Sequence, residues 1–225
     1  MGAANAIFIK QLNDLPKNIS VSLLYVLFPV LAFVMGSVMG DMEIQAAMFA
    51  ASFVGITPMI AICMTVAEDR EYKGLRFLVM AGVKPYQYLL GLGSFVLLMS
   101  LLPLAVFVWL GGFTGLHLAY FAGASLLALV ASCIFGAAIG IFAKNVQQAT
   151  AIYTPIMMIL MFMPMFATVN ETLEMIAGYV FSFQILLVAA NPEADMARAF
   201  IIIAANAVVL LGFFIFAYKK KGLRG

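Results

Sequence analysis

The sequence predicts an all-α integral membrane protein with six transmembrane helices. Of its 225 residues, 65% are hydrophobic and 10% are charged, and the mean hydropathy is +1.11. About a quarter of the residues in a typical soluble domain are charged, so this composition excludes that class. The chain also contains six apolar runs of the length that a helix needs to cross the hydrocarbon core, which is roughly 20 residues.

Clusters of charged residues separate the six apolar runs. The predicted spans are 19–38, 46–67, 88–110, 116–143, 149–169 and 200–218. Each run is expected to be helical, because backbone N–H and C=O groups in lipid must find their hydrogen-bond partners within the segment. Little chain remains outside the spans, so residues 1–225 are expected to form a single transmembrane domain.

The basic residues predict the orientation in the membrane. With alternate charge clusters on alternate sides, eleven of the twelve Lys and Arg residues fall on the side of the two termini, and only Arg198 falls on the other. Lys and Arg are retained on the cytoplasmic side of membranes. We therefore expect a multi-pass protein of the cell (cytoplasmic) membrane with both termini in the cytoplasm. An odd number of spans would scatter the basic residues over both faces.

Two segments outside the spans have predicted structures of their own. Residues 1–18 are expected to form an amphipathic helix at the interface, because Phe8, Leu12 and Leu15 recur at helical spacing among polar residues. A frayed polar tail is the alternative. Residues 170–195 begin and end with acidic residues around an uncharged middle, which favours a re-entrant or interfacial segment on the outer face.

No motif for catalysis or nucleotide binding is present in the sequence. GxxxxGK[ST], HExxH and GxSxG are all absent, and the single histidine, His117, falls in a predicted outer loop. Cys63 and Cys133 lie in apolar runs without CxxC spacing, so they are interpreted as small hydrophobic residues. A net charge of +2 without a long basic run gives no indication of nucleic-acid binding. We expect no catalytic residue, no metal ligand and no cofactor in this chain.

The spans carry no Asp, Glu, Lys, Arg or His near their middles. Transporters coupled to protons or ions usually place ionisable residues at that depth. If this chain moves a substrate uphill, the energy is expected to enter from outside the membrane. Residues 68–86 form the only cytoplasmic connection of any size, and they are the candidate entry point. The alternative is a solvated loop with the ordinary positive charges of the inner side.

That connection starts with the acidic run Glu-Asp-Arg-Glu-Tyr-Lys-Gly-Leu over residues 68–75 and continues into a short stretch that Gly82 is expected to end. This pattern resembles the membrane subunits of type-2 ABC exporters, in which an acidic cluster, a glycine and a short amphipathic helix follow the second span. Residues 83–91, Val-Lys-Pro-Tyr-Gln-Tyr-Leu-Leu-Gly, resemble the turn, aromatic residue and Leu-Leu-Gly that often follow in the family. The layout of nearly the whole chain is similar too.

The resemblance implies that residues 68–86 contain a coupling helix that docks into a groove on a separate ATPase. The predicted coupling residues are Glu68, Asp69, Arg70, Glu71 and Gly74. The implied partners are two cytoplasmic ABC ATPase subunits, which bind and hydrolyse ATP with Mg, and a second permease subunit in a homodimer or heterodimer. The expected cargo is hydrophobic or amphipathic, such as an antimicrobial peptide, a drug or a lipid-like molecule.

Two further patterns have a functional and a packing interpretation. Gly36 and Gly40 form a GxxxG pattern, which fits either a dimer contact or packing within the subunit. Met157, Met161 and Met165 form a stripe in the fifth span. Methionine is adaptable, so the stripe is a candidate substrate pathway, and lipid-facing or core packing is the alternative.

Other functions are less consistent with the sequence. A haem or cofactor export permease would favour an outer site rich in Trp and His, but the chain offers only Trp109 and His117. A channel would need a polar stripe, and the six spans have none. A non-transporting scaffold or immunity protein that sequesters a peptide stays open, and it predicts function without nucleotide.

Overall fold

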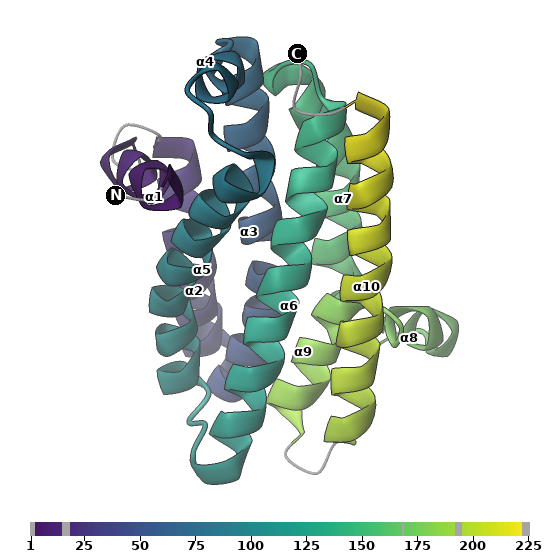
Figure 1. Ribbon diagram of the computed structural model, residues 1–225. Helices are drawn as coiled ribbons and strands as arrows, with labels where there is room; N and C mark the ends of the chain where they lie inside the picture. Colours follow the sequence, from purple (N-terminus) through teal and green to yellow (C-terminus); the bar gives the residue numbers. More distant parts are fainter. Residues whose placement is uncertain (1–2, 15–18, 168, 192–194, 222–225) are drawn as a thin grey trace.

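Each predicted span is one long α-helix in the computed structural model of the chain, which describes residues 3–14, 19–167, 169–191 and 195–221 (Figure 1). The six long helices are α2 (Ile19–Met39), α3 (Met42–Glu71), α5 (Pro85–Leu110), α6 (Gly115–Phe142), α7 (Val146–Ala167) and α10 (Met196–Lys221). All six are long and apolar enough to cross a membrane, and the described ranges contain no strand. The prediction of an all-α, multi-pass membrane protein is confirmed.

Four shorter helices complete the described part of the chain. They are α1 (Ala3–Asp14), α4 (Gly74–Met80), α8 (Glu171–Ala177) and α9 (Phe181–Ala190). Gly82 follows α4 in a left-handed conformation with φ +77°, which a side chain would disfavour. The Asn170 side chain accepts hydrogen bonds from the first turn of α8. Helices α8 and α9 meet at 108°, so the apolar middle of residues 170–195 is a sharply bent pair.

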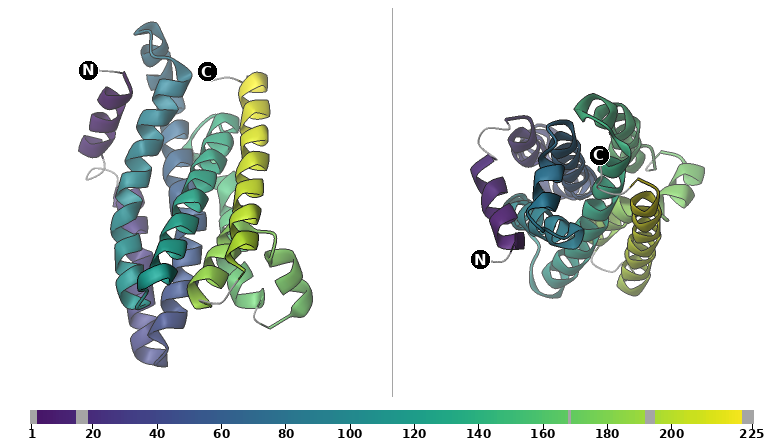
Figure 2. Two further views of the ribbon diagram at one scale, coloured as in Figure 1. Left: turned by 60° about the horizontal axis from the view of Figure 1, so that its bottom comes forward. Right: turned by 45° about the horizontal axis from the view of Figure 1, so that its top comes forward.

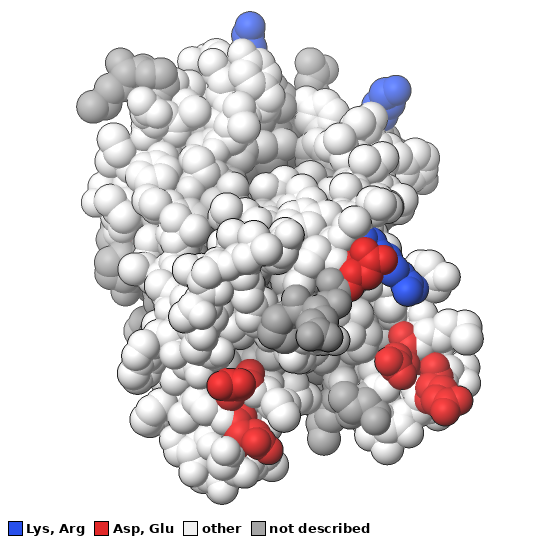
Figure 3. All heavy atoms as spheres, turned by 90° about the horizontal axis from the view of Figure 1, so that it is seen from below, with Lys and Arg blue, Asp and Glu red and all other residues white. Residues whose placement is uncertain are grey.

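The helices run side by side, and the two ends of the bundle differ in charge. Helices α1 and α4 lie toward the same end as the last turn of α10, which we call the α4 end (Figures 1 and 2). Described basic residues at this end include Lys10, Arg70, Lys73, Lys84, Lys144 and Lys219. The opposite end, the α8 end, carries carboxylates at the start of α3 and on α8 (Figure 3). The charge separation expected from the sequence is therefore present in the structure.

Helix α3 is the centre of the bundle, and 83% of its most apolar stretch is buried. Helix α6 packs closely against it through glycines. A Cβ added to Gly136 would overlap the carbonyl of Met59, and one added to Gly140 would lie 2.8 Å from Cβ of Val66. Ser132 also donates a hydrogen bond to the Gly55 carbonyl at 3.0 Å. Small residues thus let the two backbones approach, as is common between membrane helices.

Replacing Gly136 with alanine should destabilise the bundle by about 1–3 kcal/mol, because the new methyl group overlaps backbone atoms that cannot move aside. Gly212→Ala is the matched control, since a Cβ there meets nothing within 4 Å. Thermal unfolding in detergent measures the difference. Equal melting temperatures for the two variants would contradict the close approach of α3 and α6.

Candidate functional site

The predicted coupling residues Glu68 to Glu71 lie in the last turn of α3, not in a loop. The sequence prediction placed the end of the span at residue 67, where the apolar run ends. The helix continues for four more residues, to Glu71. Three of them, Asp69, Arg70 and Glu71, each bond a different part of the bundle, and we call these three residues the α3 hub.

Asp69 joins α3 to α1 and α5. Lys10 on α1 donates from Nζ to Oδ1 of Asp69 at 2.9 Å, and the hydroxyl of Tyr88 on α5 donates to Oδ2 at 2.7 Å. Tyr88 is only 2% exposed, whereas the Lys10 side chain is 47% exposed. The buried bond to a charged acceptor is therefore expected to contribute more, about 1.5–3 kcal/mol, than the half-exposed ion pair.

Arg70 and Glu71 join α3 to the junction between α6 and α7. Arg70 donates from Nη1 to the carbonyl of Ile141 in the last turn of α6. Glu71 accepts from the backbone N–H of Val146, the first residue of α7, at 3.0 Å. These contacts satisfy backbone groups that a helix end leaves without partners. The positive charge of Arg70 lies at the C-terminus of α6 and the negative charge of Glu71 lies at the N-terminus of α7. These are the signs that the two helix dipoles favour.

Gly74 brings α4 against the α3 hub. A Cβ on Gly74 would lie 3.2 Å from Oδ1 and 3.4 Å from the backbone oxygen of Asp69, which is tighter than ordinary packing. A larger residue would require Asp69 or the start of α4 to move by a few tenths of an ångström. The structure thus brings Asp69, Arg70, Glu71 and Gly74 together at one end of the bundle. Glu68 lies in the same last turn of α3.

Large apolar side chains project from α4 and the turn before it. Tyr72 is 75% exposed, Phe77 is 66% exposed and Met80 is 73% exposed. We call these three residues the α4 patch. They lie at the end of the bundle, beyond the last turn of α3 (Figure 1). An exposed apolar cluster beside charged residues is typical of a surface that binds another protein.

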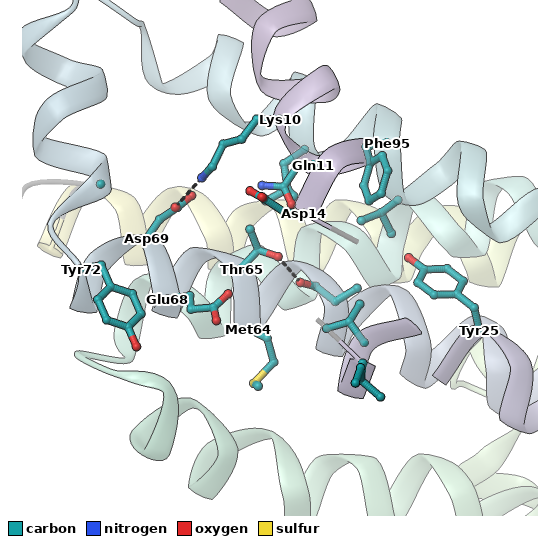
Figure 4. Close-up of a pocket in the computed structure, with 16 residues that line it drawn as sticks. Lys10, Gln11, Asp14, Tyr25, Met64, Thr65, Glu68, Asp69, Tyr72 and Phe95 are labelled. Atoms are coloured by element: carbon teal, nitrogen blue, oxygen red, sulfur yellow. Dashed lines mark hydrogen bonds and ion pairs between the residues drawn. The ribbon is translucent and has the colours of Figure 1, made fainter. Parts of the chain in front are cut away.

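A cavity of about 790 Å³ lies beside the hub, between α1, α2, α3 and α5 (Figure 4). Its charged lining residues are Lys10, Asp14, Glu68 and Asp69. Glu68, which shares the last turn of α3 with the hub, lines this cavity. Deeper in the bundle, the lining becomes apolar and aromatic, with Tyr25 and Phe95 among its residues.

The sequence did not predict the partners of the hub or the docking of α1. A Cβ on Gly91 would lie 2.6 Å from the Ala4 carbonyl oxygen, so this glycine lets α1 lie directly on α5. Tyr88 and Gly91 do belong to the stretch that resembles the exporter family. That stretch was the only sequence signal that could have indicated these residues, and it did not say what they contact.

The face that α1 turns to the bundle differs from the predicted stripe. Ile7 and Gln11 are buried, whereas Leu12 is 48% exposed. Phe8 does pack, with its ring 5.8 Å from that of Phe95. Leu15 lies outside the described residues. Polar Gln11 is buried beside the cavity and Leu12 turns outward, and a membrane contact of the predicted stripe stays a prediction.

Gly36 and Gly40 have a role within the subunit. A Cβ on Gly36 would lie 2.5 Å from Sδ of Met42, so this glycine lets α3 begin close to the end of α2. Gly40 has φ +83° and donates its N–H to the Gly36 carbonyl at 2.9 Å, which closes the turn. A contact with a second subunit stays a prediction.

The methionine stripe lies on α7. Only 11% of the apolar stretch of this helix is buried within the bundle. Met157 packs partly against the core and Met161 is 37% exposed, while the side chain of Met165 lies outside the described part. A small groove between α7 and α8 is lined by the adjacent face of α7, including Met158 and Phe162. A substrate pathway along the stripe stays a prediction.

Within the described ranges, no group of three or more His, Cys, Asp or Glu side chains is placed to hold a metal ion. Comparison with protein-family models found no match, and no curated protein matches the chain either. The features of the structure that bear on function are the hub, the α4 patch and the cavity.

The Lys10–Asp69 pair should hold α1 on the bundle. In a double-mutant cycle of Lys10→Met and Asp69→Asn, we expect a coupling energy of about 1 kcal/mol, because the pair is half-buried. Faster hydrogen exchange of the α1 backbone amides in each single variant provides the readout. Lys144→Met, which removes an exposed charge at the same end, should leave α1 unchanged. Additive effects of the two substitutions would show that the pair does not hold α1.

Proposed function

We propose that this chain is the membrane-spanning permease subunit of an ATP-driven ABC exporter. One observation carries the proposal. A short exposed helix, α4, touches a charged hub that is bonded to four other helices of the bundle. A coupling element needs both features, because it must bind a motor protein and must transmit the motion to the helices that surround a pathway.

In this proposal, the α4 patch enters a groove on a cytoplasmic ATPase, which binds ATP and Mg. Closure of two ATPase subunits moves α4, and the tight contact between Gly74 and Asp69 transfers the motion to α3. The α3 hub then shifts α1, α5 and the α6–α7 junction together. Packed helices respond to such a push by moving as rigid bodies, which supports alternating access.

The proposed orientation places the α4 end in the cytoplasm, with both termini on that side of the cell membrane. The basic residues at this end support it through the positive-inside rule. Helix α1 then lies along the cytoplasmic interface. The bent α8–α9 pair enters the bilayer from the outer side, which its uncharged middle and its 108° bend favour.

A second permease subunit, identical or related, completes the proposed transporter. Helices α7 and α10 are the least buried spans, with 11% of each apolar stretch covered, so either has surface to offer to a partner as well as to lipid. The pathway between two such subunits is apolar, and the proposed cargo is accordingly hydrophobic or amphipathic.

Removing the α4 patch should abolish binding to the ATPase. We expect Phe77→Ser with Met80→Ser to prevent co-purification of the chain with its candidate ATPase subunit, because the apolar contact is lost. Met175→Ser with Ile176→Ser is the matched control, since these residues are also exposed on a short helix but lie at the α8 end. Co-purification of the Phe77/Met80 variant at the wild-type level would refute docking through α4.

Weakening the hub should leave binding intact but uncouple hydrolysis from the membrane helices. Glu71→Ala removes the acceptor for the first N–H of α7. We expect the permease-dependent ATP hydrolysis to fall by at least about five-fold. Glu174→Ala on α8 is the control for loss of an exposed carboxylate. Full hydrolysis in Glu71→Ala would remove the coupling role, and a wild-type chain that binds no ATPase would favour the scaffold or immunity interpretation.

A further inference from the structure

The cavity beside the hub carries more negative than positive charge. Three carboxylates, those of Asp14, Glu68 and Asp69, line it together with one ammonium group, that of Lys10. Lys10 already pairs with Asp69. Glu68 has Asp69, Asp14 and Glu71 as acidic neighbours and Lys10 as a basic neighbour. A cation in this partly desolvated space would therefore be favoured.

A buried polar group also points into the cavity. Tyr25 is 7% exposed, and its hydroxyl has no hydrogen-bond partner among the described residues. Figure 4 shows this hydroxyl directed toward the middle of the lining residues. The nearby Ser100 donates its own proton to the Val96 carbonyl at 2.7 Å, so it can only accept from Tyr25, and the Tyr25 oxygen stays open to a donor. Buried hydroxyl groups without a partner are rare in proteins, so this one is available to a ligand.

Aromatic rings surround the same space. The rings of Tyr25 and Phe95 are buried in the lining, and Tyr72 of the α4 patch, which is 75% exposed, also borders the space. The face of an aromatic ring attracts ammonium groups, and this attraction increases when water is excluded. Carboxylates and aromatic rings together suit an alkylammonium head better than they suit a phosphate or a sugar.

An apolar groove shares one lining residue with the cavity. Tyr25 lines both spaces, and the groove runs between α2 and α5 with a volume of about 650 Å³. Phe33, Leu102 and Trp109 are among its lining residues and are at least half exposed. From Val96, beside the cavity, to Trp109, helix α5 rises about 20 Å. That length suits a long alkyl chain.

We propose that the cavity binds the ammonium head of a single-chain cationic amphiphile, whose alkyl tail lies in the groove between α2 and α5. As a cargo assignment, this inference rests on the proposed exporter function. The site itself belongs to one subunit and lies toward the α4 end of the bundle. Glu68 supplies the counter-charge and Tyr25 supplies the hydrogen-bonding or ring contact at the head.

Trp109 is the only tryptophan of the chain, so its fluorescence reports on the groove. The purified chain in dodecyl maltoside is titrated with ω-bromohexadecyltrimethylammonium, whose terminal bromine quenches tryptophan on contact. We expect saturable quenching that ω-bromohexadecyl sulfate, with the same tail and an anionic head, does not produce. Equal quenching by the two compounds, or no saturation, would overturn the proposal.

Two variants test the head contacts. Glu68→Gln should weaken the apparent affinity for the brominated probe by about ten-fold, and Tyr25→Phe should weaken the apparent affinity of the competitor hexadecylamine, whose N–H groups can donate to the Tyr25 hydroxyl, by about five-fold. Glu174→Gln, at the α8 end, is the control that should leave the affinity unchanged. If one head-site variant unfolds, the other still decides the result. Unchanged affinity in a folded Glu68→Gln or Tyr25→Phe chain would refute its assigned contact.

Competition then distinguishes an amphiphilic amine from a membrane lipid with the same chemical group. Displacement of the brominated probe by hexadecylamine alone supports the single-chain assignment, and equal displacement by phosphatidylethanolamine overturns it. All these measurements use the permease chain without ATPase or nucleotide. A negative result in these binding measurements therefore leaves the coupling proposal intact. A negative result in the ATPase measurements likewise leaves the binding result intact.

Discussion

The close approach of α6 to α3 is the constraint on which the other contacts depend. Gly136 and Gly140 let the α6 backbone lie against Met59, Cys63 and Val66, with no space for a larger residue. Lipid is as apolar as a leucine side chain, so burial of apolar surface gives helices little reason to associate in a membrane. Tight backbone packing therefore fixes where α3 lies, and α2, α5, α7 and α9 pack around it.

The polar contacts at the α4 end follow from that central position. Because α3 is surrounded by other helices, the three charged residues of its last turn reach different neighbours: α1 and α5 from Asp69, α6 from Arg70 and α7 from Glu71. A charge cluster on a peripheral helix would bond fewer partners. In the proposed coupling, a push at the turn before α4 reaches α1, α5, α6 and α7 through these contacts.

The cavity beside the hub has the opposite character. The hub contacts are mutually satisfied, whereas the space between α1, α2, α3 and α5 retains acidic groups around Glu68 and the unpartnered Tyr25 hydroxyl. Several acidic groups and the open Tyr25 oxygen in one partly desolvated space favour a cationic ligand there. The adjoining groove gives such a ligand a route for its apolar part without leaving the bilayer.

The sequence by itself determined the six spans, the separation of charge between the two ends and the approximate place of the short helix after the second span. Run length and charge position are sufficient for these features, because the bilayer imposes them on every chain. Only the tertiary structure decided that residues 68–71 extend α3, that Lys10 and Tyr88 hold Asp69, that Gly136 packs on Met59 and that Ile7 rather than Leu12 faces the bundle. The physical reason is that core-facing and lipid-facing residues are both apolar, so hydropathy indicates which segments enter the membrane but does not specify which helices meet there.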